Sequence, residues 1–155
     1  MRTLLLLLFA AAAWGDSIKA FGRRWDIQSA ADWALENVDG VPTLKLLVAR
    51  PSEHPRRPVQ YALAETAPLS RPVLELEVRR TGGSLILVYA WRDRDHFNYV
   101  HISEDPARKQ PVHNGVFHVY GGDRVRISKE DGPPSLPTAD WTRVRLVSLM
   151  SWERS

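Results

Sequence analysis

Two strand-like segments between Ser84 and Ser103, joined by a short charged connection, constrain the fold of this chain more than any other feature. The first segment, residues 85–91, is a nearly continuous apolar run with branched and aromatic side chains, which is typical of a strand covered on both faces. The second segment, residues 97–103, alternates more openly between apolar and polar positions. The connection, residues 92–96, reads RDRDH, and such polar residues suit a hairpin turn. This stretch therefore predicts a central β-hairpin.

Other strand-like segments precede and follow this hairpin, and Gly and Pro turn signals separate them. Residues 73–79 alternate cleanly, with apolar side chains on one face and charged side chains on the other. Residues 30–36 also fit a helical turn, although a strand over 33–38 suits the turn that follows. The remaining candidate strands are residues 43–48, 59–64, 115–120, 123–129 and 141–149. Short strands between turn signals, with almost no helical period, predict an all-β sandwich or barrel.

The N-terminal residues have the layout of a secretory signal peptide. Arg2 precedes an apolar run of leucine and alanine, and small residues then place cleavage after Ala13 or after Gly15. We therefore expect residues 1–15 to be the signal and residues 16–155 to form one β-sandwich domain. Because a membrane helix needs about 20 apolar residues, we expect a secreted or periplasmic protein with no stable membrane span after cleavage.

Composition narrows the classes of protein that this chain can belong to. Its 155 residues suffice for one domain, and it contains no cysteine, so its stability must come from burial and hydrogen bonding without disulfides. The formal net charge is only +3, and arginine and lysine are scattered on alternating strand positions. This pattern argues against a nucleic-acid partner.

Four segments, taken in order, resemble a known family over roughly residues 21–147. They are VLELEVR, GGSLILVYAWRDRDHFNYVHIS, HNGVFHVYGGDRVRIS and PTADWTRVRLV. They resemble bacterial exported domains of the concanavalin A-like lectin/glucanase jelly-roll class, near the LamG-like and 3-keto-disaccharide hydrolase domains. In such domains an aromatic residue ends one strand, a D-x-x-x-x-N-Y turn follows, and a later tryptophan opens a W-x-x-V-R strand. The matching positions here are Trp91, Asp93, Asn98, Tyr99, Trp141, Val144 and Arg145.

This resemblance implies an antiparallel β-sandwich of the jelly-roll type and a carbohydrate partner. Members of the class continue after the W-x-x-V-R strand through further strands that close the sandwich, whereas this chain ends in SLMSWERS. We therefore expect a shortened sandwich that lacks closing C-terminal strands. Strand edges left open in this way can pair with another copy of the chain, so oligomerisation through these edges is an expectation.

Carbohydrate binding requires exposed aromatic faces, on which pyranose rings stack, and planar hydrogen-bonding groups beside them. A period of two places Tyr89 and Trp91 on one face of their strand. The same period places Phe97, Tyr99 and His101 on one face of the next strand. Most strand aromatics are packing residues, so the alternative is that these side chains fill the core. The predicted ligand-binding residues are Trp91, Asn98, Tyr99, His101, Arg143 and Arg145.

Glu75 and Glu77 are the only paired carboxylates whose spacing suits catalysis. Two residues apart on a strand, they share a face and lie about 6.6 Å apart. This is near the lower end of the range of roughly 6.5–9.5 Å in inverting glycosidases. The related glucanases carry a Glu-x-Asp-x-x-Glu strand, and the third carboxylate is absent here. A solvated strand face is therefore the preferred interpretation, and catalysis by Glu75 and Glu77 is the alternative.

Asp93 and Asp95 offer oxygen ligands in the hairpin connection, and calcium sites occur in jelly-roll lectins. Connections rich in aspartate are more often plain turns, and the histidines of the chain have no recognised zinc spacing. Calcium, at Asp93 and Asp95, is therefore the only cofactor that the sequence suggests.

Together these patterns predict an exported, lectin-like domain that binds carbohydrate and has no catalytic set of its own. The alternatives are a glycoside or 3-keto-disaccharide hydrolase and an exported structural or adhesion module. A face with exposed aromatic rings favours carbohydrate binding, and a buried glutamate in a cleft favours hydrolysis.

Overall fold

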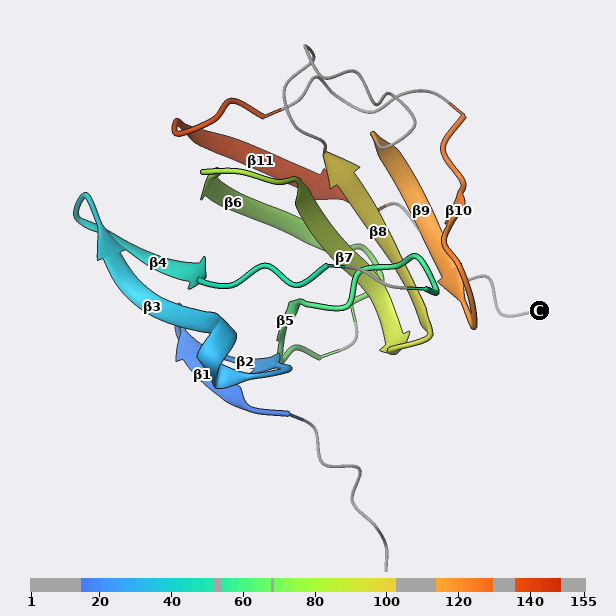
Figure 1. Cartoon of the computed structure of the whole chain (residues 1–155), viewed down its shortest axis with the longest axis horizontal. Coiled ribbons are helices and arrows are strands. Elements are labelled where there is room, and N and C mark those ends of the chain that lie inside the picture. Colours follow the sequence, from blue (N-terminus) through green and yellow to red (C-terminus); the bar gives the residue numbers. More distant parts are fainter. Residues whose placement is uncertain (1–14, 52–53, 68, 103–113, 130–135, 149–155) are drawn as a thin grey trace, which may run out of the picture. The chain divides into compact units, whose positions relative to one another are not determined.

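The computed structural model describes residues 15–51, 54–67, 69–102, 114–129 and 136–148. Within these residues the regular elements are strands, apart from one 3-10 turn, Ala30–Asp32, and all strands pair in an antiparallel manner (Figure 1). The predicted all-β fold is therefore confirmed, while the two-layer packing of a sandwich stays a prediction. The described segments contain no helix with the length and hydropathy that a membrane span requires.

The described chain forms two compact units. Unit 1 comprises residues 15–50 and 60–65, and unit 2 comprises the described residues of 51–59 and 66–148. The chain therefore leaves unit 1, contributes a short segment to unit 2, and returns to unit 1 before completing unit 2. The prediction of one domain for residues 16–155 stays a prediction, and the signal peptide lies almost wholly outside the described residues.

Unit 1 contains a three-stranded sheet and a hairpin. The sheet has the order β1-β2-β5, and the hairpin pairs β3 with β4 through a turn at Asp39 and Gly40, which both have positive φ. Its strands are β1 (Ser17–Ala20), β2 (Arg23–Ile27), β3 (Trp33–Val38), β4 (Val41–Leu46) and β5 (Ala62–Ala64).

A buried carboxylate organises the polar interior of unit 1. Asp32, at the end of the 3-10 turn, is 2 % exposed and accepts hydrogen bonds from Arg50 Nη2 at 2.8 Å and from Gln60 Nε2 at 2.9 Å. The Gln60 amide also donates to the Val48 carbonyl at 2.8 Å and accepts from the Arg50 backbone N–H at 3.1 Å. These bonds hold the end of the first chain segment of unit 1 against the start of the second, and they satisfy a carboxylate that burial would otherwise destabilise.

The stability of unit 1 is expected to depend on pH through this carboxylate. The Arg50 guanidinium beside Asp32 holds the pKa of that carboxyl below its usual value of 3.8. A depressed pKa in the folded state stabilises the fold above the unfolded-state pKa, and this contribution is lost as the pH falls below 3.8 towards the folded-state pKa. Asp32→Asn should therefore lower the thermal unfolding midpoint at pH 7, and the difference from wild type should shrink below pH 4. Thermal scans across this pH range check it, and a difference that stays constant with pH would contradict it.

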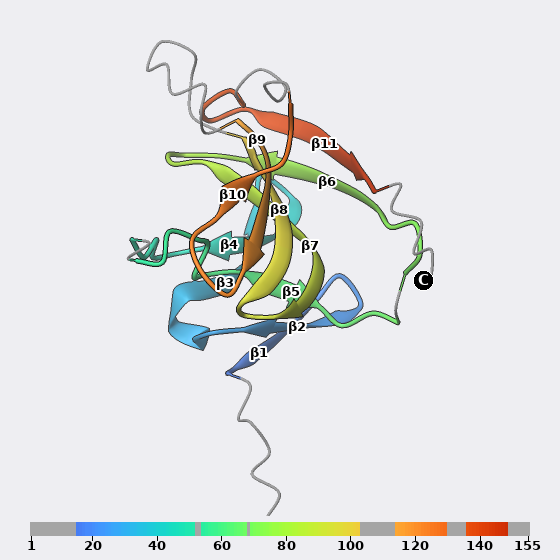
Figure 2. The same ribbon diagram turned by 90° about the vertical axis from the view of Figure 1, so that its right-hand side faces the viewer.

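Unit 2 contains a four-stranded sheet and a two-stranded ribbon. The sheet has the order β10-β9-β8-β7, and the ribbon pairs β6 with β11 (Figure 1). Figure 2 shows that β7 and β8 curve together towards the turn that joins them. The predicted central hairpin is therefore present. The strands are β6 (Val73–Arg79), β7 (Leu85–Asp93), β8 (His96–Ile102), β9 (Gly115–Tyr120), β10 (Val125–Arg126) and β11 (Trp141–Val147).

One face of the four-stranded sheet carries the hydrophobic core of unit 2. We call it the core face, and it is defined by Ile86, Val88, Trp91, Phe97, Tyr99, His101, Phe117 and Val119. Residues that pair directly across two antiparallel strands share a face, which brings Tyr99 of β8 beside Phe117 of β9. Their rings stack at 5.1 Å with 13° between their planes. Burial of such aromatic side chains is the main stabilising contribution that a sheet of this size can make.

A bulge in β7 changes which side chains share a face. Regular pairing with β8 ends at Tyr89, and Ala90 has a φ of 50° in the left-handed region. Beyond this bulge Trp91 packs on Phe97 of the core face, at 5.2 Å between ring centroids, whereas Tyr89 pairs with Asn98 on the opposite face. The expectation that Tyr89 and Trp91 share a face is therefore wrong, because an irregular register interrupts the period of two.

Candidate functional site

The face of the four-stranded sheet opposite the core face carries a band of polar and aromatic side chains near the β7–β8 turn. Two cross-strand rows form it, since Asn98 pairs with both Tyr89 and His118, and His96 pairs with both Asp93 and Tyr120. We call this band the polar strip. Its members are Tyr89, Asp93, His96, Asn98, His118 and Tyr120.

The first row is a chain of hydrogen bonds built around Asn98, which is 7 % exposed. Its Oδ1 atom lies 2.5 Å from His118 Nδ1, and since this oxygen only accepts, the Nδ1 atom carries the proton. Burial raises the pKa of the Tyr89 hydroxyl, and a hydrogen bond from Asn98 partly offsets this rise. The row therefore fixes His118 in one tautomer, in which the Nε2 atom is available to a ligand.

The second row orients His96 in the same way. Its Nδ1 atom lies 2.8 Å and 2.9 Å from the two carboxylate oxygens of Asp93. The backbone N–H of Asp95 also donates to this carboxylate, and this bond, followed by the bond from His96, lowers the pKa of Asp93. An ionised carboxylate accepts the Nδ1 proton, so the Nε2 atom of His96 also points away from its anchor.

Tyr120 is the exposed ring of the polar strip. Its side chain is 73 % exposed, the largest exposure among the bulky apolar and aromatic residues described. The His96 ring meets it edge-on at 4.8 Å, and the His118 ring lies 6.0 Å away at 20° to its plane. Two oriented imidazoles therefore flank one solvent-exposed aromatic face, an arrangement that combines stacking with directed hydrogen bonding.

The predicted ligand-binding residues of β7 and β8 fall on opposite faces of the sheet. Tyr99 is fully buried and His101 is 7 % exposed, both on the core face, where Trp91 packs against Phe97. Tyr99 therefore has no exposed ring face for stacking. Asn98 lies on the polar strip, beneath the histidine that it orients.

The predicted catalytic pair lies on the exposed ribbon of β6 and β11. Glu75 pairs with Arg145 at 2.8 Å, and Glu77 pairs with Arg143 at 3.3 Å. All four side chains are more than half exposed. The structure thus brings the two glutamates together with the two arginines that were predicted to frame a ligand. It does so as solvent-exposed cross-strand ion pairs, which contribute little energy and do not favour a catalytic role.

The two aspartates proposed as calcium ligands each have a hydrogen-bond or ion-pair partner. Asp93 accepts from His96, as described above, and Asp95 forms an ion pair with Arg57 at 2.5 Å. Across the described part of the chain, no cluster of three or more histidine, aspartate or glutamate side chains has an arrangement that suits a metal ion. The geometry at Asp93 and Asp95 is thus that of a turn held by hydrogen bonds and ion pairs.

Known proteins provide no further identification of this site. No family model, curated protein or solved structure matches the chain. The resemblance to concanavalin A-like domains therefore depends on its sequence motifs alone.

Four residues of the polar strip were not predicted as site residues: Tyr89 and His96 of the β7–β8 hairpin, and His118 and Tyr120 of β9. A period of two over residues 115–120 places His118 and Tyr120 on one face of a strand, which was the available signal. The sequence does not show that His96 and Asn98 lie beside them, because this requires the register between β8 and β9.

Proposed function

We propose that this protein is an exported carbohydrate-binding domain and that the polar strip is its binding surface. The observation that carries the proposal is the exposed ring of Tyr120, with two oriented histidines beside it. A pyranose ring presents an apolar face of C–H groups, which stacks on an aromatic ring, and a rim of hydroxyl groups, which require hydrogen-bonding partners.

The hydrogen bonds within the strip support this assignment. Because His96 and His118 each commit Nδ1 to an anchor, each offers Nε2 to a ligand in a fixed direction. Asp93 adds an acceptor that is about half exposed, with a side-chain exposure of 52 %. Such preorganised groups reduce the entropy that is lost when a flexible, polar ligand binds.

The sequence supports the same function independently. The N-terminal leader predicts export, which would place the protein where polysaccharides occur. The resemblance to concanavalin A-like lectin domains also favours a jelly-roll fold and a carbohydrate ligand. In this proposal the protein binds sugar without cleaving it, because Glu75 and Glu77 are exposed ion-pair partners of arginine.

A binding screen with one matched pair of variants tests the proposal. A glycan array first identifies a ligand, and isothermal titration then measures its affinity for the wild-type protein and its variants. Tyr120→Ala should weaken binding by about tenfold or more, since a lost aromatic contact is worth about 1 kcal/mol or more. Tyr120→Trp, which keeps an aromatic face, should retain most of the affinity.

Phe21→Ala serves as the control, because Phe21 is also an exposed aromatic residue, at 56 %, and belongs to unit 1, whereas the polar strip belongs to unit 2. It should bind the ligand as wild type does. The proposal is wrong if no glycan binds at millimolar concentration, or if Tyr120→Ala and Phe21→Ala bind equally well.

A further inference from the structure

A pair of arginines in unit 2, Arg56 and Arg124, lies near the buried Tyr99. Arg56 belongs to the segment of unit 2 that lies, along the chain, between the two segments of unit 1. We call this segment the strap and define it as residues 54–59. The backbone N–H of Arg56 on the strap donates to Asp123 Oδ1 at 2.5 Å, and the N–H of Arg124 donates to the Arg56 carbonyl at 3.0 Å. These bonds hold the strap against the turn between β9 and β10.

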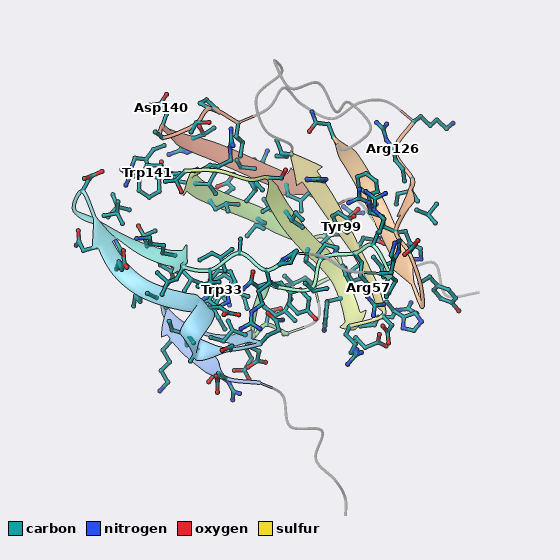
Figure 3. All side chains as sticks on the ribbon, in the orientation of Figure 1. Trp33, Arg57, Tyr99, Arg126, Asp140 and Trp141 are labelled. Atoms are coloured by element: carbon teal, nitrogen blue, oxygen red, sulfur yellow. The ribbon has the colours of Figure 1, made fainter. Side chains whose placement is uncertain are left out.

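The Arg124 guanidinium contacts two aromatic rings of the core face. Arg124 Nη1 donates to the Tyr99 hydroxyl at 3.4 Å, and the Arg124 guanidinium lies 5.0 Å from the centre of the Phe117 ring. Burial raises the pKa of the Tyr99 hydroxyl, and the hydrogen bond from Arg124 and the charges of Arg124 and Arg56 partly offset this rise. Arg126 of β10, labelled in Figure 3, pairs with Phe117 of β9, and its Nε atom donates to Ser128 Oγ at 3.1 Å.

The carboxylates near Arg56 and Arg124 are committed elsewhere. Asp95 pairs with Arg57, and Asp123 accepts from the backbone of the strap. Among the described residues, the guanidinium groups of Arg56 and Arg124 therefore have no carboxylate partner. The backbones of Arg56 and Arg124 are hydrogen-bonded to each other, so their charges are neighbours. Neighbouring like charges repel each other, and an anion bound beside them would relieve that repulsion.

We propose that Arg56 and Arg124 bind an oxyanion, namely a carboxylate or sulfate group carried by an acidic polysaccharide. Guanidinium groups suit this ligand because their planar arrays of N–H donors match the oxygens of both groups. The site lies on the core face of the sheet, opposite Tyr120, so it does not depend on the polar strip. With both sites, one protein molecule could bind a charged group at the two arginines and a sugar ring at Tyr120.

Titration with polygalacturonate, dextran sulfate and neutral dextran at low salt tests this site on the full chain. The first two polymers separate carboxylate from sulfate as the preferred group, and neutral dextran should not bind there. Arg56→Gln is the informative variant, because the exposed side chain of Arg56 makes no hydrogen bond or ion pair within the described chain, so its loss should leave the fold intact. It should weaken binding of the preferred polymer by about tenfold, as expected for a charge-assisted hydrogen bond.

Arg23→Gln removes the same charge from an exposed position of β2 in unit 1 and should change the affinity by less than about twofold. Arg124→Gln should reproduce the loss seen with Arg56→Gln. Equal losses for Arg23→Gln and Arg56→Gln would overturn the proposal, since net charge alone would then explain binding. It is also overturned if wild type binds neither acidic polymer. Arg56→Gln should leave the affinity for the neutral glycan that the polar strip binds unchanged, which separates a failure of this site from a failure of the polar strip.

Discussion

Phe97→Ala is expected to lower the free energy of unfolding by about 3–5 kcal/mol, the range seen when a buried aromatic side chain is truncated. Phe97 is 2 % exposed, and its ring lies 5.2 Å from that of Trp91 and 6.2 Å from that of Tyr99. Removing it leaves a cavity in the core face that two rigid neighbouring rings cannot fill by moving. Urea unfolding, followed by tryptophan fluorescence, measures the loss.

Phe21→Ala provides the comparison, since the same atoms are removed from a residue that is 56 % exposed and whose ring centroid lies 6.3 Å from that of Trp25. Its cost should stay below about 1 kcal/mol, as for most surface substitutions. Equal costs for the two variants would show that the core face is not the stabilising centre of unit 2.

Gly115→Ala is expected to cost about 2–4 kcal/mol, because it adds backbone strain to a steric clash. Gly115 begins β9 with a φ of 147°, which side chains rarely allow. A Cβ atom there would lie 2.5 Å from Ser128 Oγ and 3.0 Å from Arg126 Nε. Ser128 Oγ accepts hydrogen bonds from Arg126 Nε at 3.1 Å and from the Val116 N–H at 3.2 Å, so the clash would disturb the end of β9 as well.

Gly82→Ala is the matched control, because a Cβ atom at Gly82 would meet nothing within 4 Å and its φ is not in the left-handed region. It should leave the unfolding midpoint nearly unchanged or raise it slightly, since alanine restricts the unfolded chain. If Gly115→Ala and Gly82→Ala changed the unfolding midpoint equally, the close approach of Ser128 and Arg126 to Gly115 would not require a glycine at that position.

Strands with a strict alternation were predictable from the sequence, and strands without it were not. The predicted bounds of β3, β6 and β9 agree with the structure, because each segment alternates or ends at a clear turn. β1 and β2 were missed, since their residues are mostly charged or small and their pairing with each other stabilises them.

The candidate site was less predictable than the strands. The hairpin of β7 and β8 was expected to carry the function, and it contributes Tyr89, Asp93, His96 and Asn98 to the polar strip. Tyr120 and His118 come from β9, and only the register of the sheet places them beside these residues. The buried acid Asp32 gave no signal in the sequence either, because its partners lie 18 and 28 residues away.

Local pattern alone establishes that this chain forms antiparallel strands, because a period of two and the Gly and Pro turns are properties of neighbouring residues. Tertiary structure decides which side chains meet. The bulge at Ala90 places Trp91 on the core face and leaves Tyr89 on the polar strip. The pairing of β8 with β9 places His96 beside Tyr120. Register and bulges depend on the fit of several strands at once, so no single segment of the sequence contains them.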